Sequence, residues 1–358
     1  MKKRVRSLLL ASVISLTLAV SALAANGSYS DVPADHWAAS SVHRATELGL
    51  FNGIGGNQFG LGQPITRAAF VTALGRLFDW ETVTPTRASY SDVAEREWYY
   101  AAVETARANG AVISVGKNFR PTENITREEM ASMIVRSLGY TSLAGNLSTY
   151  SCPFSDVKTN KGFITIAYDL GIVGGMGGGK FAPNSTATRE QAAAMLVRAC
   201  EKLRARSVEM EDVSGYTALY VETPKAKEGA ELPATPLEPI AELYKSLRKL
   251  KNSGTDMDQV VLHLTGGGVR TLVSGTRIIE SDMLAAEEIA ELLEQDGVRV
   301  YYSDRYESAY CIYQPNGYQT ATVWYQSGES MAVKLQLARL FGVTRYALQD
   351  LPGEPSEK

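Results

Sequence analysis

A threefold internal repeat constrains the first 204 residues of this 358-residue chain. Two motifs recur in the same order at near-constant spacing: an aromatic-Ser-Asp-Val tetrapeptide, then a Thr-Arg dipeptide. They are Tyr29–Val32 with Thr66-Arg67, Tyr90–Val93 with Thr126-Arg127, and Phe154–Val157 with Thr188-Arg189. Because self-similarity at a fixed period is the signature of repeat architectures, the three segments are predicted to share one local fold.

Each segment predicts two helices joined by a turn. The Asp or Ser of the first motif is predicted to cap a first helix, which a glycine then ends. A Gly/Asn-rich turn, a phenylalanine and a proline follow, and the Thr of the second motif caps a second helix. Glu129 and Gln191 complete a capping box there, whereas Ala69 breaks it in the first unit. One unit cannot bury its apolar face alone, so the three are expected to pack together.

The order Ser-Asp-Val, Trp, Gly, Phe, Pro and Ile-Thr-Arg resembles the S-layer homology (SLH) domain, in copies at 27–80, 88–142 and 151–204. The resemblance implies a mainly α-helical pseudo-trimer of three helix-turn-helix repeats. It also implies non-covalent binding of secondary cell-wall polysaccharide, often pyruvylated, on a Gram-positive-type envelope. In that family the sugar lies in grooves between repeats, and the Arg of the Thr-Arg motif contacts it.

The position of the three arginines in the sequence also indicates that they bind a ligand. Arg67, Arg127 and Arg189 each follow the capping Thr, where the helix dipole disfavours a cation. A guanidinium suits a carboxylate such as a pyruvyl ketal, which it can hold with two hydrogen bonds. The alternative is a structural ion pair with an acidic residue of the same or a neighbouring repeat, and both interpretations stay open.

Further candidate binding residues lie near the first motif. Trp37 and Trp98 can stack on a sugar ring or belong to the core. The aspartates are interpreted first as caps and second as ligands; they are Asp31, Asp92 and Asp156. In the third unit Gly162 replaces the Trp and Gly174–Gly179 form a loose turn, so the third groove is expected to bind less well.

Residues 1–24 are predicted to be a secretory signal peptide. A basic start precedes a mostly apolar stretch from Leu8 to Leu23, which ends in an Ala-Leu-Ala cleavage pattern at Ala24. No later run reaches the ~18 apolar residues of a membrane span, so no transmembrane segment is expected after cleavage. The chain is therefore expected to be secreted and held at the cell wall, as a member or neighbour of a surface layer.

Composition excludes several other functions. The formal net charge of −3 gives no basis for binding nucleic acid. Three histidines and three cysteines without a C-x-x-C spacing predict no metal site, and no cofactor is expected. Whether Cys152 and Cys200 form a disulfide is left open.

The C-terminal part is predicted to be a linker, 205–215, and a small α/β domain, 216–358. Its last part, from Val298 to Leu351, is similar to the end of chitinase-like glycoside hydrolase family 18 domains, which implies a partial barrel with a small β insertion. The motifs are Ser308-Ala309-Tyr310, Thr322–Tyr325, Ser330, Lys334-Leu335, Gly342-Val343 and Tyr346–Leu348. A whole barrel needs about 250 residues, more than remain here.

Catalysis is not expected of this domain. The resembled family uses an Asp-x-x-Asp-x-Asp-x-Glu motif, whose Glu is the general acid. The nearest match ends at Glu222, but Gly215, Ala218 and Tyr220 replace the aspartates. The predicted function is therefore a non-enzymatic, wall-anchored surface protein. Two alternatives are an anchored glycoside hydrolase acting on peptidoglycan or chitin-like glycans, and a self-associating S-layer lattice subunit.

Overall fold

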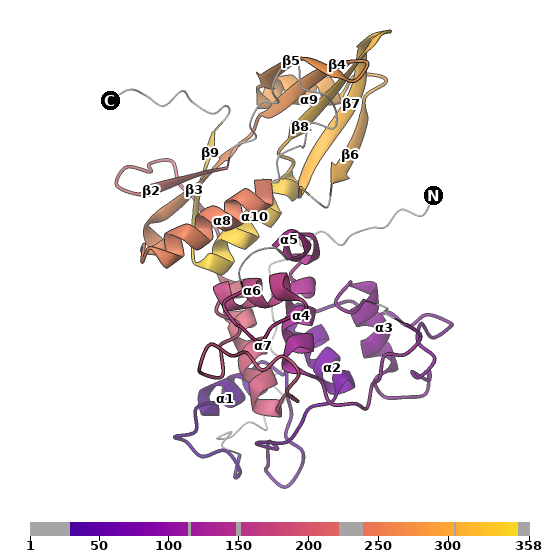
Figure 1. The fold of residues 1–358 in the computed structure, drawn as a ribbon, viewed down its shortest axis with the longest axis vertical. Coiled ribbons are helices and arrows are strands. Elements are labelled where there is room, and N and C mark those ends of the chain that lie inside the picture. The colour runs from indigo at the N-terminus through magenta and orange to yellow at the C-terminus, as the bar shows by residue number, and fades with distance from the viewer. Residues whose placement is uncertain (1–28, 114–115, 148–151, 222–238, 304–305, 350–358) are drawn as a thin grey trace. The chain divides into compact units, whose positions relative to one another are not determined.

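The computed structural model describes residues 29–113, 116–147, 152–221, 239–303 and 306–349. The described residues form two compact units, and the boundary along the chain lies between Arg204 and Ala205 (Figure 1). The predicted signal peptide and Glu222 lie outside the described residues. Within these ranges, no helix combines the length and the apolar character needed to cross a membrane.

The N-terminal unit contains the two predicted helices of each repeat. The first helices are α1 (Ala39–Glu47), α3 (Tyr100–Ala108) and α6 (Lys161–Asp169). The second helices are α2 (Arg67–Phe78), α4 (Arg127–Ser137) and α7 (Arg189–Arg204). A short additional helix, α5 (Thr141–Asn146), follows α4.

The predicted caps form at two of the three second helices. Thr66 Oγ1 accepts a hydrogen bond from Ala69 N at 3.2 Å, although that repeat lacks the box. Thr126 and Glu129 form the complete capping box of α4. The capping box predicted for α7 lacks its Thr half, because Thr188 Oγ1 is buried without a hydrogen-bond partner among the described residues.

The caps predicted for the first helices are wrong. The residues at the N-cap positions of α1, α3 and α6 are Ala38, Tyr99 and Asn160, and none of them makes a side-chain capping bond. The first-motif aspartates bind a different part of the chain, described below.

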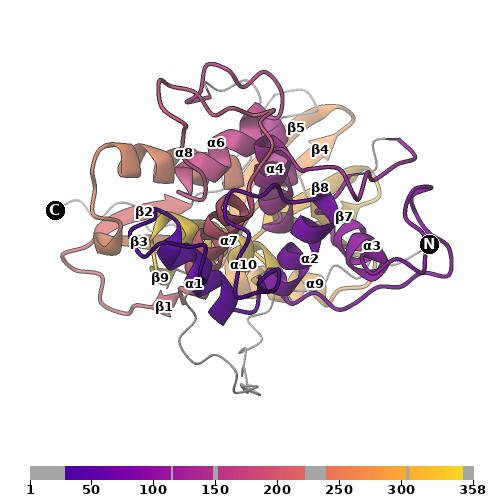
Figure 2. The ribbon, with the colours of Figure 1, turned by 90° about the horizontal axis from the view of Figure 1, so that it is seen from below.

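The repeat helices pack across repeats. α3 packs on α2, α6 on α4 and α1 on α7, so each first helix covers the second helix of another repeat. The second helices α2, α4 and α7 also contact one another, and they lie together at the centre of the view in Figure 2. Each repeat therefore needs its neighbours to bury its apolar face, as the sequence predicts.

Backbone hydrogen bonds close the same cycle. Ile125 N donates to Ile65 O at 3.0 Å, Ala187 N donates to Ile125 O at 2.9 Å, and Ile65 N donates to Ala187 O at 3.1 Å. These three residues directly precede the capping Thr of each repeat. The segments that start the second helices are thus joined to one another in a ring.

The C-terminal unit begins with a parallel sheet in the order β1-β9-β3-β2. Its strands are β1 (Val208–Glu209), β2 (Thr217–Val221), β3 (Val260–Thr265) and β9 (Arg345–Gln349). Two helices pack against each other, α8 (Pro239–Asn252) beside β2 and α10 (Gly328–Phe341) beside β3 (Figure 1). The predicted linker differs from the structure, because 205–215 contributes β1, which pairs with β9.

An antiparallel sheet is inserted between β3 and α10, in the order β5-β4-β8-β7-β6. Its elements are β4 (Gly268–Ser274), β5 (Arg277–Leu284), α9 (Ala286–Leu293), β6 (Arg299–Ser303), β7 (Ser308–Asn316) and β8 (Gln319–Tyr325). α9 covers one face of this sheet with Ile289 and Leu292, which pack against Cys311 and Val323. The predicted small β insertion is present as this sheet.

A lysine lies in the core of the C-terminal unit. Lys334 of α10 is fully buried, and its Nζ donates to Gln326 Oε1 at 2.8 Å and to the carbonyl oxygen of Glu307 at 3.0 Å. Ser308 Oγ and the carbonyl oxygen of Ser330 lie 3.4 Å from the same nitrogen. Burial lowers the pKa of Lys334 to about 7, against an opposing effect of the nearby Glu307 carboxylate.

Candidate glycan-binding grooves

The three Thr-Arg arginines make one repeated contact between repeats. The Nε atoms of Arg67, Arg127 and Arg189 donate to the carbonyl oxygens of Phe119, Phe181 and Phe59 at 2.8, 3.0 and 2.8 Å, respectively. Each guanidinium carbon also lies 4.8 to 5.0 Å from the ring centre of the same phenylalanine. The arginines therefore join neighbouring repeats.

The aspartates fix the loops that carry these phenylalanines. Asp31 accepts hydrogen bonds from the backbone N–H groups of Phe59, Gly60 and Leu61 at 2.7 to 2.9 Å. Asp92 and Asp156 bind the equivalent pairs, Phe119 with Arg120 and Phe181 with Ala182. Each aspartate thus caps a distant loop of its own repeat, and the loop presents a carbonyl oxygen to an arginine of another repeat.

The lowered pKa values of two aspartates, Asp31 and Asp156, are consistent with this capping of the loops. Burial raises the pKa of Asp31, but the hydrogen bonds from three backbone N–H groups outweigh it and leave the pKa below 3.8. The N–H of Phe181 is the largest cause that lowers the pKa of Asp156. Both carboxylates are therefore held in the ionised form by the loops they bind.

The residue after each phenylalanine adopts a left-handed conformation. Its φ is +87° at Gly60, +64° at Arg120 and +57° at Ala182. Such angles are unfavourable for residues with a Cβ atom. At Arg120 and Ala182 the hydrogen bond from the N–H to the aspartate stabilises this strained conformation, whereas Gly60 adopts it without strain.

The arginines differ in the side chain that the next repeat places against them. Arg67 Nη1 lies 2.6 Å from Glu129 Oε1, an ion pair whose angles do not satisfy a hydrogen bond. Arg127 Nη1 donates to Gln191 Oε1 at 3.4 Å. Ala69 holds the corresponding helix position in the repeat that Arg189 contacts. The third residue of each second helix thus places a carboxylate, an amide or a methyl group beside the arginine of another repeat.

Burial also differs among the arginines. Arg67 and Arg127 are each 6% exposed, whereas Arg189 is half-buried. Burial lowers the pKa of all three guanidinium groups from their usual value. The Nη2 atoms of Arg127 and Arg189 donate to the carbonyl oxygens of Gly174 at 3.0 Å and Asn52 at 2.9 Å.

A cavity of about 190 Å³ opens beside Arg67. Its polar lining comes from Arg67, Arg120, Glu129, Arg136, Asn118 and Asn160, which belong to all three repeats. The guanidinium of Arg136 lies 4.4 Å from the ring centre of Phe163, and its Nε is buried without a hydrogen-bond partner among the described residues. The cavity therefore combines several guanidinium groups and amide side chains with the Glu129 carboxylate, which already pairs with Arg67 and Arg120.

Arg120 and Arg136 are not among the residues predicted from the sequence. A signal for Arg136 was available, because an arginine recurs at the same position of each second helix, as Arg76, Arg136 and Arg198. Arg76 and Arg198 instead donate to carbonyl oxygens of their own repeats, those of Leu50 and Ile172. Only Arg120 has no counterpart in the other repeats, where Gly60 and Ala182 stand.

The tryptophans lie at the surface. Trp37 is 57% exposed and Trp98 is 67% exposed, so the interpretation that they belong to the core is wrong. The absence of a Trp in the third repeat has a steric cause: a Cβ atom on Gly162 would overlap the carbonyl oxygen of Ala144 in α5. The extra helix α5 therefore occupies the space that a side chain would need there.

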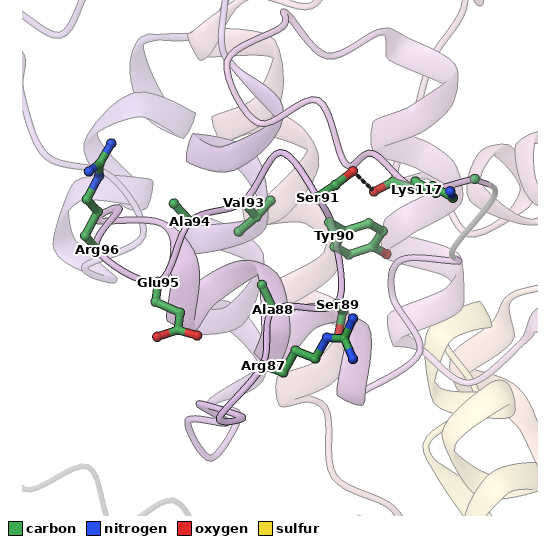
Figure 3. Close-up of a pocket in the computed structure, with 11 residues that line it drawn as sticks. Arg87, Ala88, Ser89, Tyr90, Ser91, Val93, Ala94, Glu95, Arg96 and Lys117 are labelled. Carbon is green, nitrogen blue, oxygen red and sulfur yellow. Dashed lines mark hydrogen bonds between the residues drawn. The ribbon is translucent and has the colours of Figure 1, made fainter.

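A second cavity is separate from the predicted binding residues. It measures about 920 Å³ and lies within the second repeat, between residues 87–96 and Gly116-Lys117 (Figure 3). Ser91 Oγ donates to the carbonyl oxygen of Lys117 at 3.0 Å and ties its two sides together. None of the arginines, tryptophans and aspartates predicted as binding residues lines it.

The described residues show neither a disulfide nor a metal site. Cys152, Cys200 and Cys311 are free thiols, so the disulfide that the sequence left open is not formed. Across the described ranges, no group of three His, Cys, Asp or Glu side chains is placed to hold a metal ion.

Comparison with known proteins identifies the repeats. The S-layer homology domain model matches residues 28–71, 89–131 and 153–193. An amylopullulanase from Thermoanaerobacterium thermosulfurigenes is 31% identical over 172 residues, which are 47% of this chain and 9% of that protein. An S-layer protein from Bacillus thuringiensis subsp. finitimus is 28% identical over 213 residues, 58% of this chain and 26% of that protein. The chain thus spans about a quarter or less of these relatives' lengths.

Among solved structures, a family GH18 chitinase from Cycas revoluta in complex with allosamidin is similar to part of the chain. It is 19% identical with a TM-score of 0.30, over 38% of this chain and 41% of that one. The repeated motifs, the cross-repeat contacts and the family match concern the same three segments. The chain therefore carries three S-layer homology domains.

Proposed function

We propose that this protein is secreted and anchored non-covalently to secondary cell-wall polysaccharide through its three SLH repeats, which form a pseudo-trimer. The observation that carries the proposal is the arginine at one repeated position between repeats, where its guanidinium lies against the phenylalanine of a neighbouring repeat. The closed cycle of helix contacts and backbone hydrogen bonds supports the pseudo-trimer. Similarity to an S-layer protein supports the cell surface as the location.

The ligand chemistry follows from the side chains. A guanidinium binds a carboxylate with charge-assisted hydrogen bonds, so a glycan that carries pyruvyl ketals fits these positions better than a neutral one. Trp37 and Trp98 offer exposed aromatic faces on which a sugar ring can stack. Several weak sites on one chain would raise the overall affinity for a polymeric wall glycan.

Binding to isolated wall sacculi tests this function. The full chain is expected to bind intact sacculi and to bind sacculi stripped of ketals by mild acid at least about tenfold less, as expected for the loss of a charge-assisted contact. Trp98→Ala should weaken binding to intact sacculi severalfold, because it removes an exposed aromatic face without altering the core. Tyr318→Ala, which removes an aromatic side chain that is 93% exposed in the C-terminal unit, is the control. Equal binding to both preparations would exclude the ketal as the ligand group.

The C-terminal unit is proposed to be non-catalytic. The chain has Gly215, Ala218 and Tyr220 where the resembled hydrolase motif has aspartates. Incubation of the full chain with peptidoglycan or chitin is therefore expected to release no reducing sugar above that of a heat-inactivated sample. A release that Glu222→Gln abolishes would instead favour the anchored hydrolase. Ordered sheets of purified protein in electron micrographs would favour the lattice subunit.

A further inference from the structure

The carboxylate of Glu129 already pairs with two guanidinium groups, those of Arg67 and Arg120. Its Oε1 lies 2.6 Å from Arg67 Nη1 and accepts a hydrogen bond from Arg120 Nη2 at 2.8 Å. Its Oε2 accepts the capping hydrogen bond from Thr126 N at 2.9 Å. Both oxygens are therefore engaged, and an external carboxylate could reach Arg67 only by displacing Glu129.

The surroundings keep Glu129 ionised. Burial raises its pKa, but the N–H of Thr126 and the charges of Arg67 and Arg120 outweigh burial, so the pKa lies below 4.5. The Arg67 side chain is 8% exposed and that of Glu129 is 27% exposed, so solvent screens this pair less than a surface pair. The internal ion pair thus competes effectively with any external anion at Arg67.

Among the described residues, no carboxylate pairs directly with either of the other two arginines, although Asp31 and Glu190 lie close enough to raise the pKa of Arg189. Gln191 offers Arg127 a neutral amide oxygen, and Ala69 offers Arg189 no polar atom. Within the part of the chain that the structure describes, neither arginine forms an ion pair, and their hydrogen bonds go to carbonyl or amide oxygens. Arg189 is also the least buried of the three, and its Nη1 has no hydrogen-bond partner among the described residues.

We propose that the third residue of each second helix decides which inter-repeat arginine binds an anionic sugar. Glu129 closes the Arg67 site to external carboxylates. Gln191 leaves the buried Arg127 without a charged partner, and Ala69 leaves the half-buried Arg189 open as the principal site. This inference rests on the proposed glycan-anchoring function. The sequence predicts that the loose third repeat binds less well. This inference instead makes Arg189, which belongs to that repeat, the principal binding residue.

The chain supplies its own matched substitutions. Glu129→Gln copies the third repeat, and it keeps the backbone N–H of residue 129 that donates to Thr126 Oγ1, so the side-chain cap at the start of α4 is retained. Ala69→Glu copies the second repeat and places a carboxylate beside Arg189, where Thr66 can complete a capping box. Gln191→Glu makes the same change beside Arg127. Each variant alters one charge at one site and keeps the helix start.

Binding of the full-length variants to intact and ketal-stripped sacculi tests the inference. Ala69→Glu is expected to weaken binding to intact sacculi about tenfold, and Gln191→Glu less, because each new carboxylate neutralises an open arginine. Glu129→Gln is expected to strengthen binding about threefold or more by opening Arg67. None of the three should change the weaker binding to stripped sacculi. The melting temperature of each variant, measured in parallel, identifies a purely structural effect, which would alter binding to both preparations equally.

The outcomes separate this inference from the function on which it rests. If the wild type binds both preparations equally, or neither, the ketal-dependent anchor and the inference both fail. If the wild type prefers intact sacculi but Ala69→Glu binds as the wild type does, the anchor stands and the inference is overturned. Weaker ketal-dependent binding by Glu129→Gln would also overturn it, because Glu129 would then support the ligand site.

Discussion

Replacing Arg127 with alanine is expected to destabilise the N-terminal unit by about 3 kcal/mol. The side chain is 6% exposed and donates to the carbonyl oxygens of Phe181 and Gly174 in the next repeat. A hydrogen bond from a charged group contributes about 1.5–3 kcal/mol, and its removal leaves buried carbonyl groups without a donor. For a unit of this size the melting temperature should fall by about 6–12 °C.

Hydrogen exchange of the full chain measures this effect where it occurs. Protection should fall in α4 and α6, which pack on each other, and remain unchanged in the C-terminal unit. Arg96→Ala is the matched control, because the Arg96 side chain is 87% exposed and the change should stay within about 0.5 kcal/mol. A loss in Arg127→Ala no larger than that of the control would show that the cross-repeat hydrogen bonds contribute no net stability.

The second large effect concerns Lys334. Because burial lowers its pKa from 10.5 to about 7, the unfolded chain holds a proton between these values that the folded chain has released. Stability therefore rises with pH across this window. The free energy of unfolding of the wild type relative to Lys334→Met, which cannot titrate, is expected to increase by about 3 kcal/mol from pH 7 to pH 10.

Other groups titrate in the same pH range in both the wild type and Lys334→Met. The difference between their free energies of unfolding therefore reports on Lys334 alone. Exchange protection of α10 and β8 measures the stability of the C-terminal unit at each pH. Lys249→Met, the same change at an exposed position of α8, should leave the difference flat. A flat difference for Lys334→Met as well would mean that the oxygens around Nζ keep the folded-state ammonium charged up to pH 10.

Local structure could be predicted from the sequence where a single residue or a short periodic pattern determines it. The Thr caps predicted the start of the second helices, and the apolar segment at Val260–Leu264 became β3. Val269–Ile279 has the sequence pattern of a hairpin, with Ser274-Gly275 at its middle, and it lies within β4 and β5. In each case the signal is a nearby side chain or a short periodic pattern.

Partners that lie in another repeat could not be predicted in the same way. Because all three repeats carry the same apolar pattern, the sequence cannot say whether α3 covers α2 or α4. The arginines bind backbone oxygens of Phe59, Phe119 and Phe181, and every residue has such an oxygen. The two-residue strand β1 likewise has no periodic pattern, and its pairing with β9 depends on distant parts of the chain.

The arginine sites were predicted in part. The sequence selected Arg67, Arg127 and Arg189 because each stands where a helix disfavours a cation. It also left open an ion pair with a neighbouring repeat, and Arg67 forms one with Glu129. Glu129 itself was interpreted only as a cap, because its second role depends on a contact that the fold creates.

The ring of contacts between repeats also fixes how many repeats the unit can hold. In an open array, such as a solenoid, a further copy adds to one end and finds the same neighbour surface as the last. Here the third repeat contacts the first through α7 and α1, and through Arg189 and Phe59, so no end remains free. A fourth copy would have to break one of these junctions to enter. Duplication can therefore multiply the whole three-repeat unit, but it cannot lengthen it by single repeats.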